Sequence, residues 1–139
     1  MKSEIVEVNE SCIHCRGLFA SQDINEGRLI IEYVGERISK NEAEKRELKN
    51  DEDGVTYIFY LNDDCFIDGK YGGNESIYVN HSCDPNCKVV RRNDRIYFYS
   101  KRYINKGEEL TVDYSYDKDS KKEICRCGSP KCRGYLNEA

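Results

Sequence analysis

Three cysteines near the C-terminal end constrain the fold of this chain more than any other feature. Cys125, Cys127 and Cys132 lie in the run C-R-C-G-S-P-K-C. A loop this short cannot bury enough apolar surface to hold itself together. Three thiolates on one Zn²⁺ can hold it, because metal binding then supplies folding free energy. Tetrahedral zinc needs a fourth ligand from far upstream, and the segment N-H-S-C-D-P-N-C at residues 80–87 offers one.

The composition suits one soluble domain with a moderate core. The chain has 139 residues, of which 38% are hydrophobic and 35% charged. No apolar run approaches the roughly 18 residues of a membrane helix, and Met1 to Glu4 lack the apolar stretch of a signal peptide. Eight cysteines would also suit a secreted disulfide scaffold. Their zinc-like spacing and the missing signal favour an intracellular, reducing compartment.

The charge balance points to a class of partner. The net charge is −4 and the isoelectric point is near 5.3. An acidic surface fits a basic protein or peptide better than a nucleic acid. We therefore expect a basic partner and no direct contact with nucleic acid. We also expect no membrane contact and a monomer. Solubility alone would also explain this charge.

Short runs rich in Ile, Val, Tyr and Phe predict a mainly β fold. They are Ile5–Val8, Arg28–Val34, Thr56–Leu61, Cys87–Arg91, Arg95–Ser100 and Leu110–Val112. The loop 92–94 joins two of them as a hairpin. Leu29-Ile30-Ile31 reads as a strand that is buried on both faces. Ser39 and Glu42 form a capping box, which predicts one charged surface helix that runs to about Lys49.

Polar side chains crowd the segment around Asn80 and His81. Together these two could hold a polar ligand such as an adenine or an amino-acid head group. Cys83 could act as a nucleophile activated by a histidine, or it could be the fourth zinc ligand, but it cannot do both. Further on, Tyr114 and Tyr116 lie next to acidic residues at the end of a strand. They could orient a substrate amine or cap a half-buried sheet edge.

Four motifs in this order resemble the SET-domain protein lysine methyltransferases, over residues 4 to 137. They are I-H-C-R-G-L-F-A at 13–20, E-Y-V-G-E at 32–36, the N-H-S-C-x-P-N segment within 73–87, and E-E-L-T-V-D-Y at 108–114. The tail resembles the post-SET zinc knuckle of that family. The resemblance implies a SET domain at 4–117 and a post-SET knuckle at 121–137. It also implies small curved β-sheets around a pseudoknot, in which the zinc-bound tail threads past the N-H-S-C loop.

The resemblance implies a reaction, its cofactors and the residues that serve them. S-adenosylmethionine (SAM) would donate methyl groups to a protein lysine, most plausibly in a histone tail. By position, the SAM contacts are Arg16, Gly17, Leu18, Asn80, His81 and, over the adenine, Leu136. The catalytic residues are Tyr114 and Tyr33, of which Tyr33 lines the lysine channel together with Tyr57, Val89, Val112 and Tyr116. The zinc ligands are Cys83, Cys125, Cys127 and Cys132.

Three positions depart from the family pattern or vary within it. Cys15 replaces the first Gly of the cofactor motif, and Ile77 stands where many members have Arg. The residue two before the catalytic tyrosine is often Phe or Tyr in the family and limits the number of methyl groups added. Here it is Val112, which suggests a product beyond monomethyl-lysine.

Other functions fit parts of the same pattern. A catalytically silent SET fold could bind a peptide, a non-histone protein could carry the target lysine, and a structural zinc protein would explain the cysteines alone. In a eukaryotic cell, or delivered into one, the enzyme would act in the nucleus on chromosomes; otherwise it would be cytoplasmic.

Overall fold

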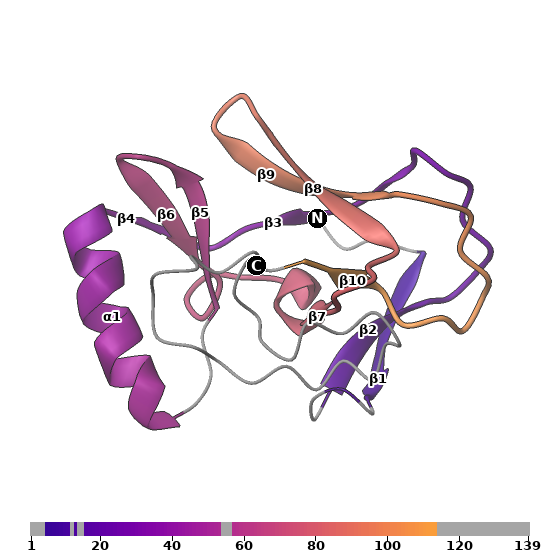
Figure 1. The fold of residues 1–139 in the computed structure, drawn as a ribbon, viewed down its shortest axis with the longest axis horizontal. Coiled ribbons are helices and arrows are strands. Elements are labelled where there is room, and N and C mark those ends of the chain that lie inside the picture. Colours follow the sequence, from indigo (N-terminus) through magenta and orange to yellow (C-terminus); the bar gives the residue numbers. More distant parts are fainter. Residues whose placement is uncertain (1–4, 12, 14–15, 54–56, 114–139) are drawn as a thin grey trace.

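A computed structural model of the protein describes residues 5–11, 13, 16–53 and 57–113 (Figure 1). Within these residues the chain forms ten short strands, one α-helix and one 3₁₀ helix, which confirms the mainly β prediction. The α-helix, α1 (Lys40–Asp53), lies at one end of the molecule. No helix in the described part is long and apolar enough to cross a membrane.

The strands form four small sheets. One antiparallel pair consists of β1 (Val6–Glu10) and β2 (Arg16–Ala20), and one parallel pair of β7 (Asn80–His81) and β10 (Thr111–Val112). The other two sheets have three strands each. The one named here the second sheet has the order β3 (Leu29–Tyr33), β9 (Arg95–Ser100), β8 (Cys87–Arg92). The one named here the third sheet has the order β4 (Glu36–Ile38), β6 (Cys65–Asp68), β5 (Ile58–Asn62). The 3₁₀ helix η1 (Glu75–Tyr78) leads into β7.

The predicted hairpin and helix start are confirmed. Strands β8 and β9 pair antiparallel, and Asn93 and Asp94 between them have φ of 53° and 59°. Two consecutive positive φ values are typical of a type I′ turn, which matches the twist of the strands it joins. At the helix start, the Glu42 N–H donates to Ser39 Oγ at 3.1 Å. The Glu42 carboxylate pairs with Arg46 at 2.9 Å, which differs from the expected return to the Ser39 backbone.

Three expectations were wrong or incomplete. The helix ends at Asp53 and not near Lys49, because Asn and Asp lower helix propensity by only tenths of a kcal/mol. The strand at Leu29 is not buried on both faces, since Leu29 itself is 40% exposed. The prediction also missed four strands, β2, β4, β6 and β7. Two of these are very short, and Gly17 weakens the strand signal of β2.

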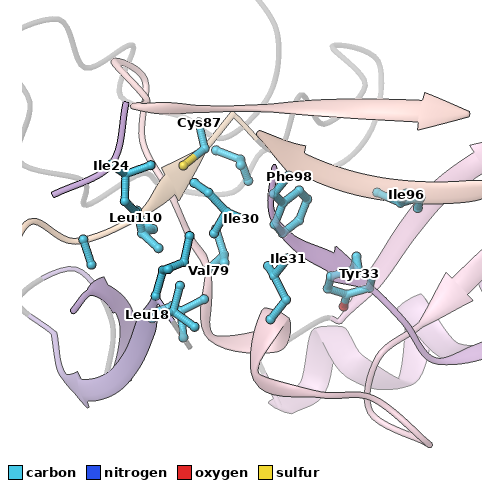
Figure 2. Packing of buried hydrophobic residues seen from close by; sticks show 14 of the residues in the cluster. Leu18, Ile24, Ile30, Ile31, Tyr33, Val79, Cys87, Ile96, Phe98 and Leu110 are labelled. Atoms are coloured by element: carbon cyan, nitrogen blue, oxygen red, sulfur yellow. The ribbon is translucent and has the colours of Figure 1, made fainter. Parts of the chain in front are cut away.

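Two hydrophobic clusters hold the sheets together. The larger one combines side chains from β2, β3, β8 and β9 with Leu110, which precedes β10 (Figure 2). Its most deeply buried members include Leu18, Ile96 and Phe98, each at most 1% exposed. The smaller cluster, Ile38, Ala43 and Ile58, fastens α1 to the third sheet. Among the side chains that the structure describes in α1, residues 40–46, Ala43 makes the apolar contact with the sheet and Arg46 makes ion pairs with it.

Those ion pairs converge on Arg46. Its guanidinium lies 2.6 Å from Glu36 of β4, 2.9 Å from Glu42 of the same helix and 3.0 Å from Asp68 of β6. Asp68 is only 2% exposed, so a charged partner is needed there. The helix expected to be a plain surface element is thus tied to the sheet by a bridging cation.

The Asn86 side chain joins the N-H-S-C loop to the segment 109–111 by two hydrogen bonds. Its Oδ1 accepts from the Thr111 N–H at 2.9 Å, and its Nδ2 donates to the Glu109 carbonyl at 2.8 Å. Nearby, the Ser82 N–H donates to the Val112 carbonyl at 3.0 Å. The N-H-S-C loop is therefore bonded directly to the strand that leads into the tail. This is the part of the expected pseudoknot that the described residues contain.

Asn86→Ala is expected to lower the free energy of unfolding by about 3 kcal/mol. Asn86 is 4% exposed, so its removal leaves a buried N–H and a buried carbonyl without their partner, at about 1–3 kcal/mol each. Thermal or urea unfolding followed by circular dichroism measures the change. Gln22→Ala, at an exposed position, is the control. Equal stability of the two variants would contradict this account.

Candidate functional site

The strands β2, β7 and β10 bring the predicted cofactor residues together. Asn80, at the start of β7, is 8% exposed. Its Nδ2 donates to the Arg16 carbonyl at 2.9 Å and to Glu109 Oε2 at 2.8 Å. A parallel ladder places Asn80 beside Thr111. The backbone of the first cofactor motif is thus fastened to the N-H-S-C segment, as a shared ligand site requires.

Glu109 is the residue of this site that the sequence prediction missed. Ser11 Oγ donates to its carboxylate at 2.7 and 2.9 Å, so Glu109 joins the β1–β2 connection to Asn80. A Cβ atom at position 17 would overlap this carboxylate. A side chain at position 17 would therefore require the Glu109 carboxylate, which orients Asn80, to move.

The sequence contained a signal for Glu109, but not a decisive one. Two glutamates, Glu108 and Glu109, precede the apolar residues of β10. Only the fold shows which of them faces inward. Glu108 turns outward to Arg102, 2.9 Å away, and this hydrogen bond holds the pKa of the Glu108 carboxyl below its ordinary value.

His81 lies between a predicted zinc ligand and the residue before the predicted catalytic tyrosine. Its ring is 3% exposed. Nε2 lies 3.4 Å from Cys83 Sγ, and Nδ1 lies 3.6 Å from Asp113 Oδ1. The order of groups is that of a Cys-His-Asp triad. However, 3.6 Å exceeds hydrogen-bond length, so His81 and Asp113 form an ion pair only when the imidazole is protonated.

Cys83 fits a metal ligand better than Cys87 does. It is a half-buried cysteine at the end of the N-H-S-C segment and forms no disulfide among the described residues. Cys87 differs from it, because burial raises the pKa of that thiol to about 12 and keeps it protonated. The described residues contain no group of three or more possible metal-binding side chains. The other three predicted ligands, Cys125, Cys127 and Cys132, lie outside these residues.

An aromatic cluster surrounds Tyr33, which is 2% exposed. The Tyr33 hydroxyl donates to the backbone carbonyl of Tyr57. Its ring centroid lies 4.5 Å from that of Phe59 and 5.9 Å from that of Phe98, and Val89 lies opposite Phe98 in the β8–β9 ladder. The structure therefore places two predicted channel residues, Tyr33 and Val89, in one apolar region, and Tyr57 contacts it through its backbone carbonyl. The sequence prediction did not include the two phenylalanines.

The remaining predicted residues divide into two groups. Leu18 and Val112 are fully buried, and Val112 lies beside His81 in the β7–β10 ladder. The other group lies outside the described residues, together with the predicted knuckle at 121–137; its members are Tyr114, Tyr116 and Leu136.

Comparison with known proteins shows which family and which proteins this chain is similar to. Residues 15–115 match the family described as "SET domain". The chain is 41% identical over 133 residues to "Histone-lysine N-methyltransferase, H3 lysine-4 specific" of Schizosaccharomyces pombe. It is 42% identical over 134 residues to "Histone-lysine N-methyltransferase SETD1B" of Homo sapiens, and 42% identical over 139 residues to "Histone-lysine N-methyltransferase trithorax" of Drosophila virilis.

These similarities cover most of this chain but little of each relative. They span 91%, 92% and 96% of the chain, in the order given, and 14%, 7% and 4% of the relatives. The chain thus corresponds to one small region of much longer proteins.

Proposed function

Because this chain belongs to the SET-domain family, we propose that it transfers methyl groups from SAM to the side-chain amine of a protein lysine. The observation that carries the proposal is the hydrogen bond from Asn80 to the Arg16 carbonyl, which joins the two predicted cofactor motifs. The names of the relatives make a histone tail the first substrate to test, and one of them is specific for H3 lysine-4. Such a substrate would place the reaction on chromatin.

The residues around Asn80 fit a cofactor with a polar head group and a flat ring. SAM, when bound, supplies an activated methyl group. The backbone of Arg16, Gly17 and Leu18 would contact it, and Asn80 and His81 would hold it further. Glu109 keeps Asn80 in place, so the site is organised before the cofactor arrives. Preorganised polar groups of this kind are a major source of catalytic rate.

The aromatic cluster around Tyr33 would lower the pKa of the substrate lysine. A free lysine has a pKa near 10.4 and is charged at neutral pH, so it cannot accept a methyl group. Apolar walls disfavour the ammonium and lower that pKa. Tyr33, Phe59 and Phe98 form such walls and exclude water. Tyr114 would orient the amine more than remove its proton, since a tyrosine with a pKa of about 10 is mostly neutral.

A radiolabelled-methyl assay tests the proposal. The protein is incubated with labelled SAM and with core histones, and we expect label in a histone. SAM binding is measured in parallel by isothermal titration calorimetry. If SAM binds, no histone is labelled and a non-histone protein is labelled, the substrate is that non-histone protein. If the protein binds a histone peptide but not SAM, it is a peptide-binding module and not a methyltransferase.

Glu109→Ala is expected to raise the Kd for SAM by about 10-fold, because a lost charged hydrogen bond costs about 1.5–3 kcal/mol. The variant removes the carboxylate that positions Asn80 and Ser11. Glu108→Ala is the matched control, since the Glu108 carboxylate pairs with the exposed Arg102 and not with Asn80. Calorimetry on both variants measures the effect. A similar Kd for both would show that Glu109 does not act on the cofactor site.

We also expect the product to go beyond monomethyl-lysine. Val112 leaves more room, and no hydroxyl, at the position where the family often has Phe or Tyr. Val112→Tyr should shift the product toward one methyl group, whereas Val90→Tyr, in strand β8 of another sheet, should not. Mass spectrometry of a peptide after many turnovers measures the distribution. A wild-type product that stops at one methyl group while the enzyme is still active would contradict this prediction.

A further inference from the structure

The second sheet has one face that packs on the core and one that faces solvent. Along its central strand β9, Ile96 and Phe98 are buried, whereas Tyr97 and Tyr99 alternate with them and are half-buried. Side chains of successive strand residues point to opposite faces. The two tyrosines therefore lie on the side of the sheet opposite to Phe98, which packs toward Tyr33.

Basic residues flank these tyrosines. The β8–β9 register places Lys88 opposite Tyr99, and Arg92 opposite Arg95. Directly opposed residues of an antiparallel pair share one face of the sheet. Lys88, Arg92, Arg95, Tyr97 and Tyr99 thus form one surface, here named the basic-aromatic face. Lys88, Arg92 and Arg95 are exposed, Arg95 with 57% of its side chain.

The distribution of charge sets this region apart from the rest of the chain. Residues 87–102 contain six Lys or Arg, one Asp and no Glu, a net charge of +5 in a chain of net charge −4. The β8–β9 hairpin also projects from the body of the molecule (Figure 1). The expectation of no nucleic-acid contact rested on total charge, but local potential determines such contacts.

The aromatic and cationic groups are already arranged against one another. Arg92 Cζ lies 5.3 Å from the centroid of the Tyr97 ring, and Arg92 Nη2 donates to the Tyr99 hydroxyl at 2.9 Å. The two rings lie 6.5 Å apart in an edge-to-face arrangement. Arg95 lies 3.5 Å from Glu32, so the face carries three cations and this one carboxylate partner.

We propose that the basic-aromatic face binds single-stranded nucleic acid. Unpaired bases stack on tyrosine rings and on planar guanidinium groups, while the adjacent cations contact phosphates. A duplex keeps its bases stacked within itself, so it would engage only the cations. An acidic peptide has no succession of flat rings for the tyrosines. Because Tyr33 lies across the sheet, a strand bound here leaves the aromatic cluster of the proposed lysine site free.

Fluorescence anisotropy with labelled 12-nucleotide probes tests the proposal on the full chain. The probes are an oligo-uridylate, an oligo-thymidylate and a 12-base-pair duplex, with polyglutamate as competitor. We expect a single-stranded probe to bind more tightly than the duplex. Three phosphate contacts predict a log–log salt slope of about −2, so the Kd should rise about 15-fold between 50 and 200 mM salt. The tighter of the two single strands identifies RNA or DNA as the ligand class.

Two sets of variants locate the binding. Tyr97→Leu with Tyr99→Leu should weaken binding at least about 10-fold, because stacking contributes about 1–3 kcal/mol per base. Tyr97→Phe with Tyr99→Phe keeps the rings and should stay within about threefold of the wild type. Lys88→Gln, Arg92→Gln and Arg95→Gln together should remove most of the salt dependence. Circular dichroism verifies that each variant is folded.

The matched charge control is Lys40→Gln, Lys45→Gln and Lys70→Gln, which removes the same charge at exposed positions elsewhere. It should bind as the wild type does. Equal weakening by this control would mean that only total charge matters and would overturn the proposal. Duplex or polyglutamate bound as tightly as the single strand would also overturn it, as would full affinity in the leucine variant. None of these outcomes depends on methyl transfer.

Discussion

Tyr114→Phe is expected to lower the rate of methyl transfer by about 100-fold or more, the effect of losing one preorganised polar group. The change removes a hydroxyl and almost no volume, so SAM should bind as before. Tyr114 directly follows Asp113, whose carboxylate lies 3.6 Å from His81. The hydroxyl would therefore act beside the segment that we propose to hold the cofactor. Single-turnover assays with labelled SAM measure transfer, and calorimetry measures binding.

Two further variants show whether this loss is chemical. Tyr71→Phe removes a hydroxyl from an aromatic residue that is 51% exposed, and its rate should not change. Asn80→Ala should instead weaken SAM binding, because it leaves the Arg16 carbonyl and the Glu109 carboxylate without their donor. His81→Ala should do the same. An unchanged transfer rate in Tyr114→Phe would remove this tyrosine from the mechanism.

Removal of zinc is expected to abolish activity and to release one Zn²⁺ per chain. Cys83 would share the ion with Cys125, Cys127 and Cys132, so the metal would tie the tail to the N-H-S-C segment. Structural zinc contributes on the order of 10 kcal/mol or more to folding at neutral pH. A strong chelator should therefore release the tail and the cofactor residue expected near Leu136. Elemental analysis before and after chelation, with activity after zinc is restored, measures both effects.

Cys83→Ser and Cys65→Ser form a matched pair, because both cysteines are half-buried and neither forms a disulfide among the described residues. Only Cys83→Ser should lose zinc. Cys12 and Cys87 are likewise expected to be free thiols, and their replacement should not change metal content. Pure, active protein without zinc would disprove the site. Retention of zinc in Cys83→Ser together with loss of activity would favour the alternative in which His81 activates Cys83 as a nucleophile.

The sequence alone predicted those features that depend on local chemistry. Short runs rich in Ile, Val, Tyr and Phe indicated a mainly β chain, and Asn93 and Asp94, with their positive φ values, form the turn of the predicted hairpin. Ser39 capped the helix as expected. The ordered motifs identified the family, and residues 15–115 match it. Each of these signals depends on a few neighbouring residues, so it can be recognised without knowledge of the fold.

Residues that act through distant partners could not be predicted in this way. Asn80 was expected to bind the cofactor, but its bond to the Arg16 carbonyl spans 64 positions. Glu109 and Asn86 were missed because their roles exist only when β7 and β10 lie side by side. Neither a hydrophobic period nor a cap marks such residues, since their hydrogen bonds join segments that local patterns treat separately.

The contrast is clearest where two similar neighbours have different environments. Glu108 and Glu109 are chemically identical, and the sequence assigned both to one acidic run, yet one pairs with exposed Arg102 and the other orders Asn80. Tyr97, Phe98 and Tyr99 are all aromatic, and β propensity treats them alike. The sequence determined that a strand forms there. Only the packing of β9 between β3 and β8 decided that Phe98 enters the core while the tyrosines face solvent, because strand alternation allows either face inward until tertiary contacts bury one of them.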